Sequence, residues 1–318
     1  RGASSVITSQ QGNVLAVNRS EQTGTPKTSE TSIVLDASGV VGDAHAGPWH
    51  RQVSLLDYEL IEGFSAEHGR NVHPGEFAEN ITTQGIDLAD VAPFDRLESG
   101  TVVLEVTQIG KHCHGDSCAI FREVGACIMP KTGIFARVLS GGTLRPGDPL
   151  VHSPRPLKIC TITVSDRASR GEYADRSGPR IRTRLETHFA ETRWHLVNTP
   201  RLVPDDRPAI QTAIEEAISD GADVIFTTGG TGIGPRDVTP DVVTDIIEKA
   251  IPGVMEHIRL TCAAKTPNAL LSRSVAGTKG KTLIYALPGS VKAVDEYLDG
   301  ILSTLEHAVQ MLHGLDTH

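Results

Sequence analysis

The sequence of 318 residues contains no apolar run long enough to cross a membrane and no basic amino-terminal segment followed by an apolar one. A membrane helix needs about 20 consecutive apolar residues, and a secretory signal needs that basic-then-apolar order. The chain also has no stripe of Lys and Arg, and its formal net charge is −9. Proteins that bind a nucleic-acid backbone usually carry such a stripe. We therefore expect a cytoplasmic protein with no membrane partner and no nucleic-acid partner.

The chain also lacks paired cysteines in a Cys-x-x-Cys spacing and shows no internal repeat. Its five cysteines are an odd number in a long chain, which argues against a disulfide scaffold. Small anions remain possible ligands despite the negative charge, because backbone N–H groups can bind them without a basic side chain.

The pattern of apolar and turn residues changes near residue 155. Residues 1–153 alternate short β-branched runs with Gly, Asp and Pro turns, which predicts a mostly-β barrel or sandwich. The segment Ser153-Pro154-Arg155-Pro156 then predicts a short stiff linker. Residues 157–318 alternate strands with helices, which predicts an α/β domain of three layers around a mostly parallel sheet.

Several individual elements can be predicted. We expect one helix in the first half, at Leu56–Glu67. The second half is expected to contain the strands Leu157–Val164, Trp194–Val203, Asp223–Thr228 and Lys281–Leu287 and the helices Pro179–Phe189, Pro208–Ser219, Pro240–Ala250 and Ser290–His313.

A glycine-rich loop follows the predicted strand Asp223–Thr228. Four glycines occur within Gly229–Gly234, and Thr239-Pro240-Asp241 then suits the start of a helix, with Thr239 as its cap. Such a loop can cradle a phosphate through its backbone N–H groups. It is not a P-loop, because the Lys-Ser/Thr ending is absent. A simple tight turn is the alternative.

Polar residues follow two other predicted strands of the same sheet, and acidic residues follow a third. Ser165-Asp166-Arg167 and Pro288-Gly289-Ser290 are the two polar segments, and Asp205, Asp206 and Asp237 are acids in loops. Ligands of open α/β sheets collect at the carboxyl ends of strands. Carboxylates there can share Mg²⁺ with nucleotide phosphates. The alternative for Asp205 is that it only caps the next helix.

These segments together resemble the molybdopterin adenylyltransferase family, whose fold also occurs in gephyrin-type proteins. The resemblance runs from about Leu157 to the carboxyl terminus. It rests on Ser165-Asp166-Arg167-Ala168-Ser169, Leu202-Val203-Pro204-Asp205, Thr227-Thr228-Gly229-Gly230-Thr231-Gly232, Arg236-Asp237-Val238-Thr239-Pro240-Asp241, Pro252-Gly253, Leu271-Ser272-Arg273 and Leu287-Pro288-Gly289-Ser290.

The resemblance implies a reaction in which the terminal phosphate of molybdopterin attacks the α-phosphorus of ATP and pyrophosphate leaves. It implies Asp205 and Asp237 as functional acids, Asp237 as the residue that holds Mg²⁺, and a homotrimer. Molybdenum insertase and other proteins of the cofactor pathway are the expected partners. The binding residues that it implies for molybdopterin and ATP are Ser165, Asp166, Thr228, Gly229, Gly230, Thr231, Gly232, Thr239, Asp241, Ser272, Pro288, Gly289 and Ser290.

The first half resembles the MOSC family, the carboxyl-terminal domain of molybdenum cofactor sulfurases. The resemblance rests on Val41-Gly42-Asp43-Ala44-His45-Ala46-Gly47, His50-Arg51-Gln52-Val53-Ser54-Leu55, Gly75-Glu76-Phe77-Ala78-Glu79-Asn80-Ile81, Gly85-Ile86-Asp87-Leu88, Gly133–Leu139 and Gly142–Asp148. It implies a mostly-β barrel with a cysteine that carries sulfur or binds the metal of the molybdenum cofactor.

Two residues are candidates for the cysteine that the resemblance implies, Cys118 and Cys113, with Cys118 favoured by its distance from Gly133. Neighbouring histidines would lower a thiol pKa if charged, as suits a persulfide carrier or a soft-metal ligand. His45 and Arg51 could meet the pterin phosphate. The alternatives are cysteines that only fill a core, or a zinc site formed by His112, Cys113, His114, Cys118 and Cys127.

Both resemblances point to molybdenum cofactor biosynthesis, so we expect a fusion with an adenylyltransferase domain at 157–318 and a domain at 1–153 that holds cofactor, metal or sulfur. A non-catalytic carrier or storage protein for the cofactor is the competing hypothesis, although a pure binder needs no pair of Mg²⁺-directed acids such as Asp205 and Asp237. A molybdate or tungstate sensor is a third hypothesis, and no DNA-binding segment supports it.

Overall fold

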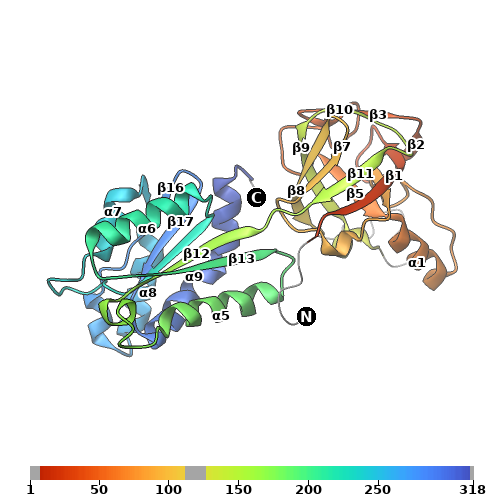
Figure 1. Cartoon of the computed structure of the whole chain (residues 1–318). Coiled ribbons are helices and arrows are strands. Elements are labelled where there is room, and N and C mark those ends of the chain that lie inside the picture. The colour runs from red at the N-terminus through yellow and green to blue at the C-terminus, as the bar shows by residue number, and fades with distance from the viewer. Residues whose placement is uncertain (1–7, 112–126, 316–318) are drawn as a thin grey trace. The chain divides into compact units, whose positions relative to one another are not determined.

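The structure is a computed structural model that describes residues 8–111 and 127–315 (Figure 1). The chain divides into two compact units. Unit 1 comprises Arg1–Pro156 together with Arg193–His195, and unit 2 comprises Leu157–Thr192 and Leu196–His318. No helix in the described ranges is both long and apolar enough to span a membrane.

Unit 1 is a closed barrel of seven strands, as the sequence predicts. The strand order is β11-β7-β8-β9-β5-β6-β1, and β1 also pairs with β11, which closes the sheet; β2 extends from β1. A separate small sheet has the order β10-β3-β4. The strands are β1 (Gln10–Arg19), β2 (Thr28–Glu30), β3 (Ile33–Asp36), β4 (Gly39–Val40), β5 (Val53–Asp57), β6 (Ile81–Gln84), β7 (Arg96–Ser99), β8 (Val102–Ile109), β9 (Ile134–Ser140), β10 (Gly142–Leu144) and β11 (Pro149–Ser153).

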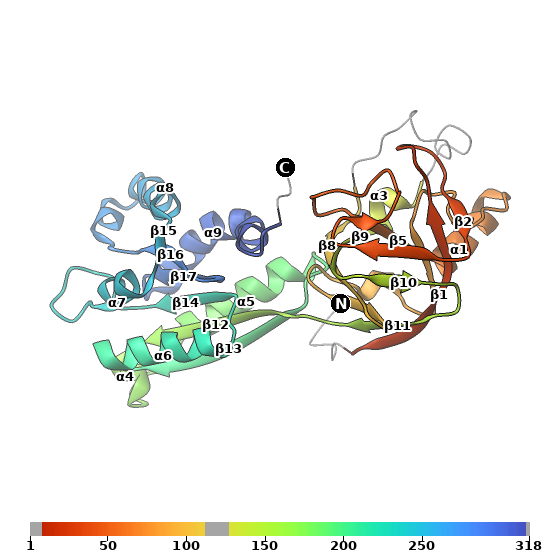
Figure 2. The same cartoon turned by 90° about the horizontal axis from the view of Figure 1, so that it is seen from above.

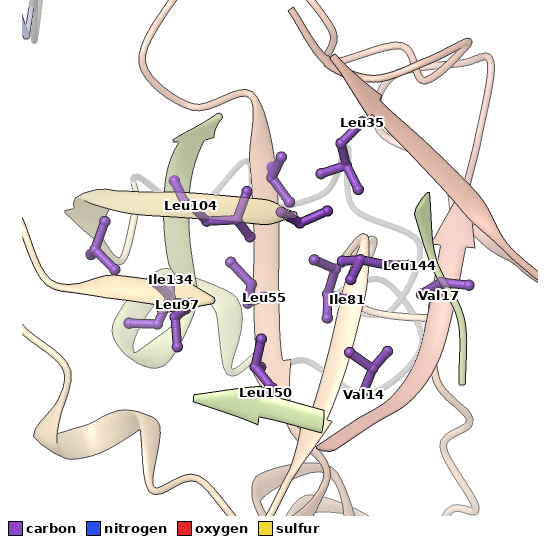
Figure 3. Close-up of a cluster of buried hydrophobic side chains, with 14 of the residues drawn as sticks. Val14, Val17, Leu35, Leu55, Ile81, Leu97, Leu104, Ile134, Leu144 and Leu150 are labelled. Carbon is purple, nitrogen blue, oxygen red and sulfur yellow. The ribbon is translucent and has the colours of Figure 1, made fainter. Parts of the chain in front are cut away.

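Alternating side chains of these strands fill the barrel (Figure 3). On β8, Val102, Leu104 and Val106 are almost fully buried, whereas the residues between them are half-exposed. Leu55 and Ile81 extend the same cluster across the barrel. A period of two residues places every second side chain on the inner face, which is why the first half of the sequence shows short apolar runs rather than helical spacing.

The described part of unit 1 also contains the short helical elements α1 (Tyr58–His68), η1 (Leu88–Asp90) and α3 (Met129–Thr132). The predicted helix start at Leu56 is wrong, because Leu56 and Asp57 belong to β5. The helix begins one residue after Asp57, whose side chain accepts a hydrogen bond from the backbone N–H of Leu60 at 2.7 Å. A side-chain acceptor of this kind fixes the first turn of a helix.

A buried carboxylate organises one side of unit 1. The Asp95 side chain faces Nε2 of His152 at 2.7 Å and Nε2 of His195 at 3.2 Å. It also accepts hydrogen bonds from the backbone N–H groups of Ala92 and Arg155. These contacts lower the pKa of Asp95 against the effect of its burial, which acts in the opposite direction. The two imidazoles and the two N–H groups already surround the carboxylate, so this cluster is a structural support for the adjoining segments.

Unit 2 is built on a six-stranded sheet with the order β13-β12-β14-β17-β16-β15. Strands β13, β12, β14 and β17 are parallel to one another, whereas β16 is antiparallel to both β17 and β15. The strands are β12 (Leu157–Val164), β13 (Leu196–Val203), β14 (Val224–Thr228), β15 (Lys249–Ala250), β16 (Ala276–Lys279) and β17 (Thr282–Leu287). The predicted mostly parallel sheet is thus confirmed.

Helices cover both faces of this sheet (Figures 1 and 2). On one face α5 packs against α9 and β12, and on the other α6 packs against α7 and β12. The apolar side of α6 carries Ile210 and Ile214, both fully buried. The helices are α4 (Asp166–Ser169), α5 (Ser177–Ala190), α6 (Arg207–Ser219), α7 (Thr239–Ile246), α8 (Pro252–Ala263), η3 (Pro267–Leu271) and α9 (Val291–Leu312).

One predicted helix of unit 2 is too long. The helix expected at Pro240–Ala250 ends at Ile246, and Lys249–Ala250 instead form strand β15 beside β16. Pro252 disfavours a helical backbone at the residue before it, and the N–H of Ile251 donates to the carbonyl oxygen of Ala276. The chain therefore leaves the helix and joins the edge of the sheet.

Candidate functional site

The carboxyl ends of four parallel strands meet at one edge of the sheet in unit 2. Val164 of β12 pairs with Val203 of β13, and Thr228 of β14 lies beside both Thr163 of β12 and Leu287 of β17. The loops that follow these strands are therefore neighbours. We call the group formed by these loops the strand-end site, and it contains the polar segments that the sequence analysis singled out.

The glycine loop after β14 runs close to the neighbouring loops. Gly229 has a φ of +109°, and a Cβ there would lie 2.3 Å from the carbonyl oxygen of Val164. Gly230 has a φ of +62°, and a Cβ there would lie 2.6 Å from Oγ1 of Thr239 and 2.7 Å from Oδ1 of Asp205. Only glycine accepts both the backbone conformation and the close approach. The loop thus reaches Asp205 and Thr239 through its bare backbone.

Several N–H groups of this loop are available for a ligand. The N–H of Gly229 donates to the carbonyl oxygen of Leu287, and that of Gly234 donates to Asp237. Among the residues that the structure describes, no acceptor is found for the N–H groups of Gly230, Thr231 or Gly232. Consecutive free N–H groups next to a helix start can bind a phosphate.

Asp205 is not a helix cap. The cap of α6 is the next residue, Asp206, whose carboxylate accepts the N–H of Ala209 at 3.3 Å. The Oδ1 atom of Asp205 is buried and has no hydrogen-bond partner in the described part of the chain. Burial raises the pKa of Asp205, and the negative charge of Asp237 raises it further. A buried, unpaired carboxylate oxygen is costly unless something binds it.

Asp237 approaches the glycine loop from the other end. Its carboxylate accepts the N–H of Gly234 at 2.9 Å, and a Cβ at Gly232 would lie 2.7 Å from its Oδ2. Gly230 lies against Asp205 and Gly232 lies against Asp237, so the glycine loop has one acid near each of these neighbouring residues. Two carboxylates beside free backbone N–H groups can bind a divalent cation and a phosphate side by side.

Thr239 does not cap α7 as predicted. It is the first residue of the helix, and its backbone N–H donates to the carbonyl oxygen of Gly230. Its Oγ1 atom is buried and has no partner in the described ranges. Because a residue with helical backbone angles cannot fold its side chain back as a cap does, the hydroxyl faces Gly230 instead.

Other predicted site residues hold the loops in place. Thr228 donates through Oγ1 to the carbonyl oxygen of Pro288 at 2.8 Å. Ser165 and Ser290 cap α4 and α9 through their hydroxyl groups. Asp166 accepts the backbone N–H of Asp205 at 2.9 Å and forms an ion pair with Arg236.

The remaining predicted site residues also lie at this edge. A Cβ on Gly289 would lie 3.2 Å from the Cα of Gly229. Asp241 pairs with Arg273, and Ser272 contacts the hydroxyl groups of Ser274 and Tyr297. The sequence analysis missed Arg273 and Tyr297 because their contacts come from segments distant in the chain.

Unit 1 contains a pocket of about 410 Å³, which we call the barrel pocket. Its lining combines basic, aromatic and thiol side chains and includes His45, Trp49, Arg51, Lys111, Cys127 and Phe135. The Arg51 guanidinium lies 4.8 Å from the ring centre of Trp49, and Nζ of Lys111 lies 5.9 Å from that of Phe135. The Nε atom of Arg51 is buried and has no partner in residues 8–111 or 127–315. This lining suits a flat, anionic ligand.

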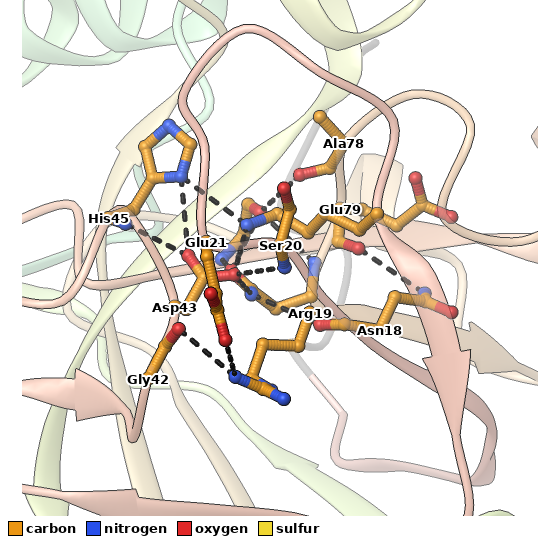
Figure 4. Close-up of polar contacts among 12 residues, drawn as sticks. Asn18, Arg19, Ser20, Glu21, Gly42, Asp43, His45, Ala78 and Glu79 are labelled. Atoms are coloured by element: carbon orange, nitrogen blue, oxygen red, sulfur yellow. Dashed lines mark hydrogen bonds and ion pairs between the residues drawn. The ribbon is translucent and has the colours of Figure 1, made fainter.

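A buried charged network supports one wall of the barrel pocket (Figure 4). Lys27 and Asp43 form an ion pair whose side chains are 1% and 0% exposed. Asp43 also accepts the backbone N–H of His45 at 2.9 Å and Nδ2 of Asn80 at 3.0 Å. Burial opposes ionisation of Asp43, but the side chain and backbone N–H of His45 and the Lys27 ammonium together hold its pKa far below the usual value. Through Asp43, the network fixes His45 at the pocket.

Of the cysteines considered for unit 1, the described residues include only Cys127. Cys113 and Cys118 lie outside the described residues, as do His112 and His114 of the alternative zinc site. Cys127 is described, is half-buried and lines the barrel pocket. Cys160 and Cys262 in unit 2 are buried and belong to its core. A pocket of this kind cannot be seen from spacing alone, so the sequence analysis considered Cys127 only as a zinc ligand.

Taken together, the fold and the strand-end site define an α/β protein with a glycine loop and two converging acids for a phosphate-bearing ligand. Comparison with known proteins agrees with this class. Residues 160–307 match the family model described as a probable molybdopterin binding domain, and residues 42–151 match the MOSC domain.

The second half of the chain is similar to molybdopterin adenylyltransferases. It is 36% identical over 172 residues to that of Haemophilus influenzae, covering 50% of this chain and 86% of the relative. It is 34% identical to that of Escherichia coli, covering 50% and 80%. It is also 38% identical to the molybdenum cofactor biosynthesis bifunctional protein of Synechococcus elongatus, covering 49% and 47%. The chain belongs to the molybdopterin-binding family of molybdenum cofactor biosynthesis proteins, here joined to a MOSC domain.

Proposed function

We propose that unit 2 adenylylates molybdopterin with ATP and Mg²⁺. The observation that carries the proposal is the placement of Asp205 and Asp237 around the glycine loop, with Asp205 left uncommitted because Asp206 caps α6. In the proposed reaction the terminal phosphate of molybdopterin attacks the α-phosphorus of ATP. A new phosphorus–oxygen bond forms, the bond to the β-phosphate oxygen breaks, and pyrophosphate leaves.

The residues of the strand-end site orient these groups. The free N–H groups of Gly230, Thr231 and Gly232 would hold phosphate oxygens, and the Thr239 hydroxyl lies beside them. No covalent nucleophile from the protein is required, because orientation and charge neutralisation supply the rate enhancement.

The acids of the strand-end site fit a Mg²⁺ ion. The buried, unpartnered Oδ1 atom of Asp205 and the nearby carboxylate of Asp237 are hard oxygen donors of the kind that this ion prefers. Asp237 would bind the ion, and Asp205 would supply a further carboxylate oxygen near it. When bound, Mg²⁺ would neutralise charge on the phosphates.

We propose further that the barrel pocket of unit 1 holds the pterin cofactor. Arg51 and Lys111 supply positive charge for its phosphate, and Trp49 and Phe135 supply flat apolar faces for its ring system. Cys127 places a thiol in the same pocket. Two pterin sites per chain in the unaltered protein and in the surface variant Arg145→Gln, with one site left in Arg51→Gln, would support this role.

The first experiment measures release of pyrophosphate and formation of adenylylated molybdopterin from ATP, Mg²⁺ and metal-free molybdopterin. We expect Asp237→Asn to lower the rate by at least about 100-fold, because it removes one charge from a cation site. Asp205→Asn is expected to act in the same direction.

Asp206→Asn is the matched control for these two variants. It changes an acid one position from Asp205, and an asparagine still caps α6. Normal turnover in this control together with loss in Asp237→Asn supports the proposal. Tight pterin binding without turnover in the unaltered protein would replace the enzyme with a carrier.

A further inference from the structure

Arg273, on the segment between η3 and β16, contacts the loop of residues 229–238 that connects β14 to α7 in the strand-end site. Its backbone N–H donates to the carbonyl oxygen of Thr231 at 2.8 Å, and its Nε donates to that of Gly232 at 2.9 Å. Its Nη2 also donates to the backbone oxygen of Asp237. A single residue therefore contacts this loop both at its glycines and at Asp237, which is one of the proposed Mg²⁺ acids.

The same guanidinium forms a two-pronged pair with Asp241 at the start of α7. Its Nη1 lies 2.9 Å from Oδ1 of Asp241, and its Nη2 lies 2.9 Å from Oδ2. The pairing lowers the pKa of Asp241 and raises that of Arg273. A planar fork fixes direction as well as distance, which an ammonium group cannot do.

The segment that carries Arg273 is itself anchored to the core. The hydroxyl of Tyr297 on α9 donates to Oγ of Ser272 at 3.0 Å, and that oxygen lies 2.9 Å from Oγ of Ser274. Tyr297 and Ser274 are both buried. Arg273 thus connects the loop of residues 229–238 to α9 through one short segment.

We infer that Arg273 is the positioning residue of the strand-end site, which sets the glycine loop and Asp237 in one arrangement for the phosphates and the cation. The inference rests on the proposed function of unit 2. By holding the carbonyl oxygens of Gly232 and Asp237, Arg273 keeps these partial negative charges beside its own positive charge. Asp237 and Asp241 also lie within its electrostatic reach.

The pair with Asp241 is too exposed to act mainly through stability. The side chains of Arg273 and Asp241 are 38% and 48% exposed, and such pairs contribute little to the free energy of unfolding. Loss of Arg273 should instead show in turnover and in the response to Mg²⁺. Misplacement of reacting groups by about 1 Å can lower a rate by about 100-fold.

The test compares Arg273→Gln and Arg273→Lys with Arg259→Gln in the full chain. Arg259 is a matched control, because it also donates to a carbonyl oxygen of this region, that of Ser274 at 2.8 Å, and in the described part of the chain it has no hydrogen bond to the loop of residues 229–238. We expect Arg273→Gln to lower kcat by about 10- to 100-fold and to raise the Mg²⁺ concentration that gives half the maximal rate. Arg273→Lys should resemble Arg273→Gln, and Arg259→Gln should resemble the unaltered protein.

Hydrogen exchange of the ligand-free protein gives a second readout, which does not depend on activity. Exchange in the peptides that cover residues 229–238 should be faster in Arg273→Gln and unchanged in Arg259→Gln. Equal kcat, Mg²⁺ response and exchange in these two variants would overturn the inference, as would full rescue by lysine. If the unaltered protein releases no pyrophosphate, the proposed function fails, and the exchange data alone decide whether Arg273 orders the loops.

Discussion

The two sites position their polar groups in different ways. Beside the barrel pocket, buried side chains such as Lys27 and Asp43 contact one another, whereas the strand-end site uses backbone N–H groups and acids of the loops that follow the strands. Asp43 of unit 1 is 0% exposed and pairs with Lys27, while Asp241 of unit 2 is half-exposed and pairs with Arg273. A buried pair cannot lose one partner cheaply, but an exposed pair can. We therefore expect a substitution in the buried network beside the barrel pocket to lower the stability of unit 1. A substitution in the exposed pair at the strand-end site should leave the stability of unit 2 almost unchanged.

Breaking the buried pair should have the largest effect on stability. Asp43→Asn leaves the Lys27 ammonium buried without its partner, which should cost about 3–5 kcal/mol of unfolding free energy. Tryptophan fluorescence during urea unfolding reports on unit 1, because both tryptophans, Trp49 and Trp194, belong to it. Asp241→Asn should shift unfolding by less than about 1 kcal/mol. Equal effects of the two variants would contradict the comparison.

The acid Glu79 of unit 1 should make stability depend on pH. Burial raises its pKa to about 7 from the model-compound value of 4.5, so the folded state favours the protonated carboxyl. Its contribution is therefore full below pH 4.5 and is lost as the pH rises to about 7.

Glu79→Gln removes this titration and keeps the side-chain shape. Between pH 4.5 and 7, the unfolding free energy of the unaltered protein should fall relative to Glu79→Gln by up to about 3 kcal/mol. Urea titrations at several pH values measure this difference. A difference that does not change with pH would mean that Glu79 is already ionised in the folded protein.

Adding a side chain to the glycine loop of unit 2 should lower activity much more than stability. Gly230→Ala places a methyl group against Thr239 and Asp205 at a positive φ, which should cost about 1–2 kcal/mol of stability. Turnover should fall by about 100-fold because the phosphate-binding N–H groups and Asp205 move together. Gly253→Ala on α8 is the control, since a Cβ there would meet no other segment of the described chain within 4 Å. Activity retained in Gly230→Ala would separate the loop from the chemistry.

The smallest expected effect concerns the cap beside the site. Asp206→Ala removes the acceptor for the N–H of Ala209 and should cost about 1 kcal/mol. Asp205→Ala should cost no stability, because its carboxylate caps nothing and its burial raises its pKa. Thermal unfolding of the two variants measures the contrast. A larger loss in Asp205→Ala would assign the structural role to that residue.

Much of unit 2 could be predicted from local pattern. The spacing of Ile210, Ile214 and Ile218 marks one face of α6, and Ser290, where the predicted last helix begins, caps α9. The glycines after β14 marked the loop that approaches its neighbours. These features depend on residues that are close in sequence, so periodicity and capping rules reach them.

Other features lay beyond such rules. The short strand β15 forms only because β16 offers its edge to Lys249 and Ala250. Thr239 entered the helix rather than capping it, since its backbone N–H binds Gly230 in the preceding loop. The His152 and His195 contacts of Asp95 also join segments far apart in the chain.

The sequence by itself determined the two-part architecture, the alternation of strands and helices, and the residue types available at the strand ends. Only the tertiary structure decided that Asp206, and not Asp205, caps α6, that Arg273 contacts both ends of the loop between β14 and α7, and that Cys127 and Arg51 line the same pocket. Local preferences act over a few residues, whereas burial, pairing and pockets depend on which distant segments the fold brings together.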